Sequence, residues 1–234
     1  MATQVFDNLQ VTTGLVFPKI AGIGIQIENN ANPYPSSPTF GWRDLLGPII
    51  PHVGGGSAPT STLYRGAGTN IRLYSFAANN VIDQIPFHLP HDYVPGTDIY
   101  FHMHWTHAGT AISGNFVMNW YFTYAKGYNQ SGQILTAEIN NTQTIATANV
   151  AAFPQHGHFI NELQCSVAGG SGTQLNSSLF EPDGVIIVGG VATTIPTITG
   201  SPGGSVNNPF IFYCDLHYQS TGINTKNKNV PFYT

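Results

Sequence analysis

The sequence predicts an all-β protein: a jelly-roll-like antiparallel β-sandwich that forms one domain over residues 1–234, with long loops and little helix. Two observations support this prediction. Only 8% of the residues are charged, and the helix formers Glu and Lys are scarce, whereas Asn, Ser, Thr and Gly are abundant. Short alternating segments recur between clusters of Gly, Pro, Asn and Ser, which is typical of strands separated by turns.

Seven segments alternate between apolar and polar residues over lengths typical of strands. They are residues 22–28, 70–77, 98–106, 115–125, 157–168, 183–192 and 210–219. Loops rich in Gly, Pro, Asn and Ser are expected at 29–38, 54–61, 169–172 and 200–208. Residues 42–50 contain the one expected helical turn, which Pro48 would end almost at once.

Residues 98–125 are expected to form the central hairpin, because two alternating runs flank a loop at 108–114 that contains Gly and Ser. Side chains of a strand alternate between its two faces, so each run should carry one apolar stripe into the core. The two stripes are Ile99, Phe101, Met103 and Trp105 on the first run, and Phe116, Met118, Trp120, Phe122 and Tyr124 on the second. A similar stripe is expected on the last strand, at Phe210, Phe212, Cys214, Leu216 and Tyr218.

Charge and composition exclude some classes of partner. Seven basic and 11 acidic residues give a formal charge of -4, and no Lys/Arg cluster could follow a row of phosphates, so we expect no direct binding of nucleic acid. No apolar run is long enough to span a membrane, so we expect no membrane partner, and the N-terminus does not resemble a signal peptide. Residues 1–20 and 221–234 are expected to be extended arms.

The two cysteines, Cys165 and Cys214, are too few for a disulfide scaffold and have no CxxC spacing, so the first interpretation is a pair of buried thiols. A bridge between them stays open. Neither they nor any serine motif supplies a nucleophile, and the acidic residues are scattered. We therefore assign no catalytic, cofactor-binding or metal-binding residue, expect no cofactor, and predict that the protein is not an enzyme.

The histidines offer one alternative to this assignment. His102 and His104 lie two residues apart on a predicted strand, so they point the same way and could share a metal ion. With Gly96 ahead of them, they resemble the opening of the first cupin motif, but Ala108 and Gly109 stand where that motif has its Glu. Strand parity places His107 on the other face, and His156 and His158 form a second pair. The favoured interpretation is that these histidines and His217 pair with Asn, Tyr and Asp neighbours or line a contact between subunits.

Three segments resemble structural proteins of tailed bacteriophages. Residues 87–100 read Phe-His-Leu-Pro-His-Asp-Tyr-Val-Pro-Gly-Thr-Asp-Ile-Tyr and continue into His102-Met103-His104-Trp105. Residues 42–48 read Trp-Arg-Asp-Leu-Leu-Gly-Pro, and residues 215–221, Asp-Leu-His-Tyr-Gln-Ser-Thr, are followed by Thr-Lys-Asn-Lys at 225–228. The resemblance implies a location in the virion, after assembly in the host cytoplasm, and a β-sandwich. It implies no site residues.

The sequence thus favours a non-enzymatic virion structural protein, a capsid decoration or cement protein that stabilises the assembled shell through subunit contacts. Its expected partners are copies of itself, as a trimer, and other virion proteins such as the major capsid protein. The alternative is a tail or fibre module that binds host surface carbohydrate, with Tyr34, Tyr64, Tyr74, Tyr128 and Tyr233 as stacking platforms. A cupin-like metal-binding protein that uses His102 and His104 is the weaker alternative.

Overall fold

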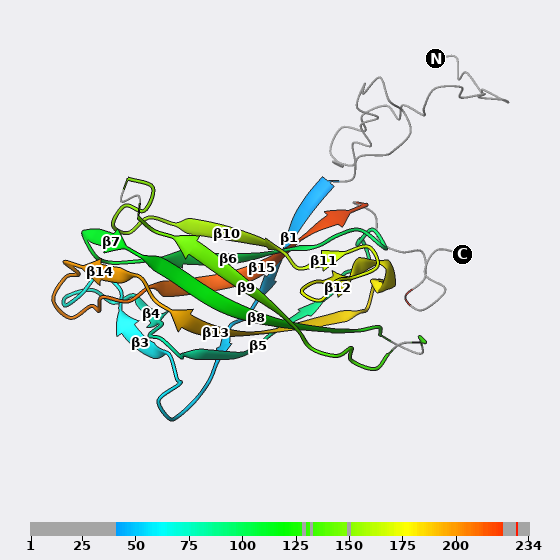
Figure 1. The fold of residues 1–234 in the computed structure, drawn as a ribbon, viewed down its shortest axis with the longest axis horizontal. Coiled ribbons are helices and arrows are strands. Elements are labelled where there is room, and N and C mark those ends of the chain that lie inside the picture. Colours follow the sequence, from blue (N-terminus) through cyan, green and yellow to red (C-terminus); the bar gives the residue numbers. More distant parts are fainter. Residues whose placement is uncertain (1–40, 128–129, 132, 149–150, 222–227, 229–234) are drawn as a thin grey trace, which may run out of the picture.

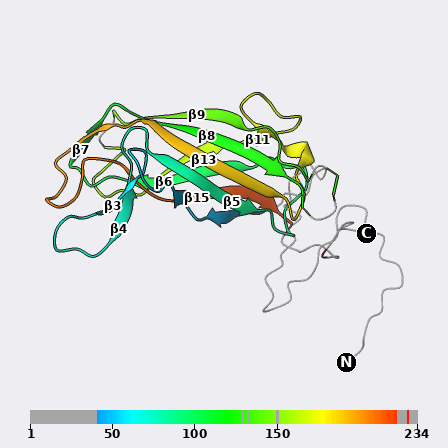
Figure 2. The same ribbon diagram turned by 90° about the horizontal axis from the view of Figure 1, so that it is seen from below.

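The computed structural model describes residues 41–127, 130–131, 133–148, 151–221 and 228. Two sheets dominate the structure and pack face to face (Figures 1 and 2). The first sheet has the order β10-β6-β15-β4-β3, with β1 also paired to β15, and the second has the order β2-β5-β13-β8-β9. Every pairing within them is antiparallel. The predicted all-β sandwich is therefore confirmed.

The strands of the first sheet are β1 (Gly41–Gly47), β3 (Thr60–Leu63), β4 (Arg72–Ser75), β6 (Tyr100–Thr106), β10 (Phe159–Gln164) and β15 (Phe210–Ser220). Those of the second sheet are β2 (Ile50–Pro51), β5 (Val81–His88), β8 (Asn115–Ala125), β9 (Ile139–Ala146) and β13 (Val185–Thr194). Two small sheets join β7 (Ala111–Ser113) to β14 (Thr197–Thr199), and β11 (Ser166–Val167) to β12 (Leu175–Asn176). Within the described ranges the only helix is the short η1 (Ser177–Leu179).

The order of the eight main strands is that of a jelly roll. Most successive strands change sheet: β4, β6, β10 and β15 lie in the first sheet, and β5, β8, β9 and β13 lie in the second. The resulting four-stranded orders are β4-β15-β6-β10 and β5-β13-β8-β9. The chain passes back and forth between these two layers, as it does in a double-sheet jelly roll. This crossing places strands that are distant in sequence side by side, as Figure 1 shows for β6 and β15.

The predicted central hairpin is wrong. β6 lies in the first sheet and β8 in the second, and the chain between them passes through β7. The apolar stripes of the two strands do fill the core, but they meet across the layers: the rings of Phe101 and Trp120 are 4.7 Å apart, and those of Trp105 and Phe116 are 5.2 Å apart. A stripe specifies which face is buried, and it does not specify which strand lies alongside.

Two further local predictions need correction. Residues 42–50 form no helical turn, because β1 pairs with β15 along its whole length, from Gly41 to Gly47. On β15 a bulge between Ile211 and Tyr213 shifts the alternation, so that Ile211 replaces Phe212 in the main core while Cys214, Leu216 and Tyr218 stay in it. The predicted strand at 22–28, the loop at 29–38 and most of the two predicted arms lie outside the described residues.

Candidate functional site

A group of polar side chains lies on the outer face of the first sheet, over β10, β6 and β15. In the strand register, His102 on β6 is flanked by Glu162 on β10 and by Asp215 on β15. His104 lies next to them on β6, and His158 just precedes β10. We call these five residues, His102, His104, His158, Glu162 and Asp215, the histidine–carboxylate cluster.

The alternation of the strands forces these side chains outward. On β6, Phe101, Met103 and Trp105 are fully buried in the core, so the histidines between them face away from it. On β15, Cys214 and Leu216 point inward and leave Asp215 on the same outer face as the histidines. The bulge between Ile211 and Tyr213 determines which residues of β15 face outward. It also places the ring of Tyr213 in a stack on His104, with centroids 4.2 Å apart.

Asp215 is the centre of the cluster. Its Oδ1 lies 3.1 Å from His102 Nδ1, and its Oδ2 lies 2.7 Å from His104 Nε2. The exposed fractions of the Asp215, His104 and His102 side chains are 3%, 7% and 12%. Neither contact has the angles of a hydrogen bond, so no described residue supplies a hydrogen-bond partner to the buried atoms His104 Nε2 and Asp215 Oδ1.

The outward nitrogens of the two histidines have partners of their own. His102 Nε2 lies 3.0 Å from Glu162 Oε2, and His104 Nδ1 lies 2.8 Å from His158 Nε2. An ionised carboxylate can only accept, so His102 Nε2 carries a hydrogen and donates it to Glu162. Between His104 and His158 one nitrogen donates and the other accepts.

The two central histidines differ in basicity. The Asp215 carboxylate raises the pKa of His102, and Glu162 adds to this effect against the opposing effect of burial. Burial lowers the pKa of His104, and this outweighs the attraction of Asp215, while His158 and His102 lower that pKa further. A proton bound by the metal-free cluster is therefore held on His102 rather than on His104.

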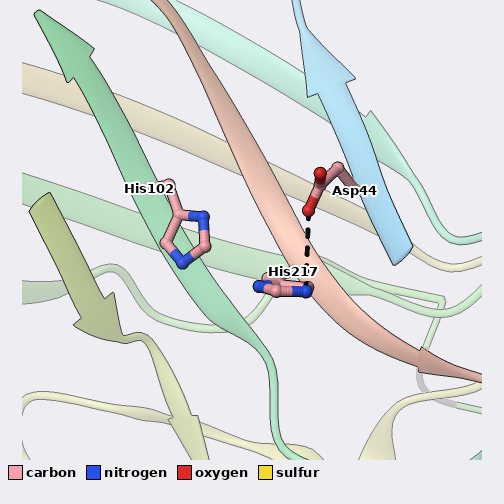
Figure 3. Close-up of side chains that lie close together, drawn as sticks. All are labelled: Asp44, His102 and His217. Atoms are coloured by element: carbon pink, nitrogen blue, oxygen red, sulfur yellow. Dashed lines mark ion pairs between the residues drawn. The ribbon is translucent and has the colours of Figure 1, made fainter. Parts of the chain in front are cut away.

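A second group of potential metal ligands shares His102. Figure 3 shows Asp44 on β1 and His217 on β15 beside His102, on three strands of the first sheet. His217 Nε2 lies 3.7 Å from Asp44 Oδ1, and the rings of His102 and His217 have centroids 5.0 Å apart. The Asp44 side chain is 60% exposed, so this group is wetter than the cluster around Asp215.

The other histidines singled out in the sequence lie elsewhere. His107 is buried and its Nε2 contacts the carbonyl of Phe153, so strand parity correctly separates it from the pair. His156 packs on the ring of Tyr64, and only His158 of the second pair joins the cluster. The predicted pairing of histidines with Asp and Tyr neighbours is confirmed for His102, His104 and His217.

Sequence reasoning missed the carboxylates of the cluster. Asp215 and His217 share the polar face of the last strand, but the pairing of that strand with β6 has no signal in the sequence. Glu162 reaches His102 through the pairing of β10 with β6, which is equally non-local. The one local indication of a polar site was the acidic residue Asp215, which lies between two apolar positions of a predicted strand.

The remaining candidates carry little chemistry. Cys165 and Cys214 are free and buried, as first expected, and burial raises the pKa of both thiols. A pocket of about 360 Å³ opens between Tyr124, Ile139, Leu175 and neighbouring residues, and no His, Cys, Asp or Glu is among its described lining residues.

The carbohydrate-binding alternative loses one platform. Tyr64 is buried, and its hydroxyl lies 3.0 Å from the hydroxyl of Thr106, whereas Tyr74 is exposed. Tyr34, Tyr128 and Tyr233 lie outside the described residues.

Comparisons with known proteins add no assignment. No protein-family model matches the chain, and neither a curated protein nor a solved structure matches it. In the described part of the chain, no helix is long and apolar enough to cross a membrane.

Proposed function

We propose that this protein is a non-enzymatic structural subunit that assembles with copies of itself through the outer face of the first sheet. The observation that carries the proposal is a set of exposed apolar side chains around the histidine–carboxylate cluster. Trp42 and Leu46 on β1 are 46% and 67% exposed, and Ile160 on β10 is 54% exposed. We call these three residues the apolar rim.

The rest of this face has the composition of a protein–protein contact. Tyr100 and Tyr213 lie between the rim residues, and Tyr and Trp are enriched in such contacts, whereas Lys is depleted. Of the residues of β1, β6, β10 and β15, only Arg43 is a Lys or Arg, and it points to the opposite face, where it pairs with Asp92. The face therefore presents no cluster of positive charge that would repel a second copy.

A second copy of the chain is the occupant that this surface favours. Only 8% of the sequence is charged, so two copies repel each other weakly. The face also carries both His and carboxylate groups, so a His-bearing part of one copy can meet a carboxylate-bearing part of the next, as the head-to-tail contact of a cyclic trimer requires.

The resemblance of the sequence to structural proteins of tailed phages supports a more specific role. In that role the subunit is a trimeric decoration or cement protein of the virion that binds the major capsid protein. A subunit that binds only the assembled shell stabilises it by mass action, by about 2.7 kcal/mol per site at a hundredfold excess over Kd. Decoration of a shell needs no catalytic residue.

Light scattering of the purified protein tests the assembly, and Leu46→Lys tests the face. We expect an oligomer, trimeric for the decoration role, which Leu46→Lys dissociates by burying a charge in the contact. Val53→Lys is the matched control, because Val53 is 83% exposed and lies outside β1. A monomeric wild-type protein would contradict the proposal, and an oligomer that both variants leave intact would contradict the choice of face.

Co-sedimentation with undecorated phage shells tests the virion role. The same preparation should pellet with the shells and should raise their resistance to heat. An oligomer that stays in the supernatant would contradict the decoration role while leaving self-assembly in place.

A further inference from the structure

We propose that His102, His104 and Asp215 form a binding site for a divalent transition-metal ion of the Zn²⁺ type. This site goes beyond the structural role proposed above and does not depend on it. We assign His102 Nδ1, His104 Nε2 and one carboxylate oxygen of Asp215 as the ligands. Each of the three residues offers one ligand atom, and these three atoms lie within 4.8 Å of one another. Two imidazole nitrogens and one carboxylate oxygen are a common set of protein ligands for zinc.

Apart from a proton on His102, the centre of the cluster has no positive charge. The Asp215 carboxylate is 3% exposed, and in the described part of the chain its ion-pair partners are His102 and His104, with no Lys or Arg among them. Burying a carboxylate is costly unless a cation or several hydrogen bonds compensate for it. A metal ion between the three side chains supplies that charge.

Two buried atoms at this point also receive no hydrogen bond from the part of the chain that the structure describes. They are His104 Nε2 and Asp215 Oδ1, and both belong to the proposed ligand residues. Buried polar atoms are nearly always satisfied in folded proteins, so two in one place indicate a missing partner. A metal ion accepts the lone pair of an unprotonated Nε2 and of a carboxylate oxygen together.

The residues around the ligands are arranged as the outer shell of a metal site. A metal-bound histidine usually donates its other N–H to a carboxylate or another acceptor, which fixes the ring and the tautomer. Glu162 Oε2 accepts from His102 Nε2 at 3.0 Å, so His102 Nδ1 is the free ligand atom. His158 Nε2 lies 2.8 Å from His104 Nδ1, and when it accepts that hydrogen, His104 Nε2 is left as the second ligand atom.

An ion at this site requires the ligand atoms to move. Two ligand atoms about 2.1 Å from a tetrahedral zinc ion are about 3.4 Å apart. His104 Nε2 and Asp215 Oδ2 are 2.7 Å apart, so they must separate by about 0.7 Å, whereas His102 Nδ1 and Asp215 Oδ1 at 3.1 Å are already close to that spacing. All three ligand atoms lie within 4.8 Å of one another, so no pair has to approach by more than about 1.4 Å.

The alternative ligand set of Asp44, His102 and His217 is less suited to the ion. Asp44 is 60% exposed, so water already compensates its charge. Both groups need His102, so we treat them as alternative sites for one ion. Asp215 and Asp44 therefore distinguish the two sites experimentally.

The test uses the full chain, purified without a polyhistidine tag and stripped with a chelator. Titration with Co²⁺, followed by its visible absorption, and competition with Zn²⁺ measure stoichiometry and affinity. We expect one saturable ion per chain. Glu162→Gln should weaken binding by about 10- to 100-fold, as outer-shell changes do, and His102→Gln and Asp215→Asn should weaken it more.

Two variants serve as controls. His88→Gln should bind like the wild type, because His88 lies on β5 in the second sheet and is exposed. Asp44→Asn should also bind like the wild type if the ion sits at Asp215. Circular dichroism establishes that each variant is folded, and Glu162→Gln changes an exposed residue, so the test does not depend on the buried ones.

Three results would overturn the assignment. The first is the absence of saturable Co²⁺ or Zn²⁺ binding by the wild-type chain. The second is wild-type affinity in folded His102→Gln and Glu162→Gln variants. The third is loss of binding in Asp44→Asn with binding retained in Asp215→Asn, which would move the ion to the neighbouring group.

Discussion

Two aspartates are buried to a similar degree but are compensated very differently, and their isosteric variants should differ in stability. Asp92, in the segment between β5 and β6, accepts hydrogen bonds from Arg43 Nη1 at 2.8 Å, Ser220 Oγ at 2.6 Å and Tyr218 OH at 3.1 Å. Among the described residues, Asp215 has two histidine contacts, and neither has hydrogen-bond geometry. We expect Asp92→Asn to be strongly destabilising and Asp215→Asn to be nearly neutral.

The expected loss of stability in Asp92→Asn follows from the hydrogen bonds that Asp92 accepts. An amide in place of the carboxylate removes the charge that faces Arg43 and turns one acceptor oxygen into a donor. Hydrogen bonds to a charged group contribute about 1.5–3 kcal/mol each, and the Arg43 side chain is 57% exposed, so its share is reduced by solvent. We expect the free energy of unfolding to fall by about 2–4 kcal/mol, which is roughly 5–15 °C in Tm for a chain of this length.

The expectation at Asp215 follows from the absence of such bonds. At alkaline pH and with a chelator present, His102 and His104 can both be neutral, so Asp215→Asn leaves no unpaired charge behind. The variant also removes the cost of burying a carboxylate. The free energy of unfolding should then change by less than about 1 kcal/mol, in either direction.

Thermal unfolding of the three proteins, in chelator at about pH 9, measures the difference. A drop in Tm for Asp215→Asn as large as that for Asp92→Asn would refute this reasoning. It would show that Asp215 is a structural residue of the metal-free fold, and the unsatisfied cluster would then give no reason to expect an ion.

Three further outcomes are expected. Gly190→Val should lower the free energy of unfolding by about 1–3 kcal/mol, because a Cβ at Gly190 would lie 2.5 Å from the ring of Trp120. Gly189→Ala should be tolerated, since a Cβ at Gly189 meets nothing closer than 3.6 Å, and thermal unfolding compares the two variants. Cys165 and Cys214 should not react with a thiol reagent in the folded protein and should both react in denaturant, and labelling of the native state would contradict their burial. Burial raises the pKa of Tyr124 to about 12, whereas an unfolded tyrosine has a pKa of about 10. The stability that Tyr124 contributes is therefore complete below about pH 10 and is lost as the pH rises through the folded pKa. Tyr124→Phe should flatten the fall in Tm over that pH range, and an unchanged slope would contradict this expectation.

Much of the fold could be predicted because strands leave a local signal. The alternation over 115–125 matches β8 (Asn115–Ala125) residue for residue, and the runs at 98–106 and 210–219 match β6 and β15 closely. β5 and β9 were missed because their local patterns are weak. β5 contains Pro86, which is tolerated where β2 no longer runs beside it. β9 is a polar edge strand whose burial alternates along its length, but only Gln143 and Ile145 are buried and one of these is polar, so the sequence shows no apolar stripe.

The candidate site could be predicted only in part. His102 and His104 share a face because the side chains of any strand repeat every two residues, and that much is a local property. Their partners come from strands 60 and more than 100 residues away in the chain, through the pairing of β6 with β10 and β15. No local pattern at Glu162 or Asp215 encodes that pairing.

Local properties of the chain are enough to specify the class of structure, the apolar stripes of the core and the outward direction of the histidine pair, because backbone geometry and the burial of apolar surface act over a few neighbouring residues. They do not specify that β6 and β8 face each other across two sheets, or that β15 carries Asp215 between His102 and His104. Both features depend on the order of the strands in the two sheets. That order is set by how all the apolar stripes pack together in one core, so no single segment encodes it.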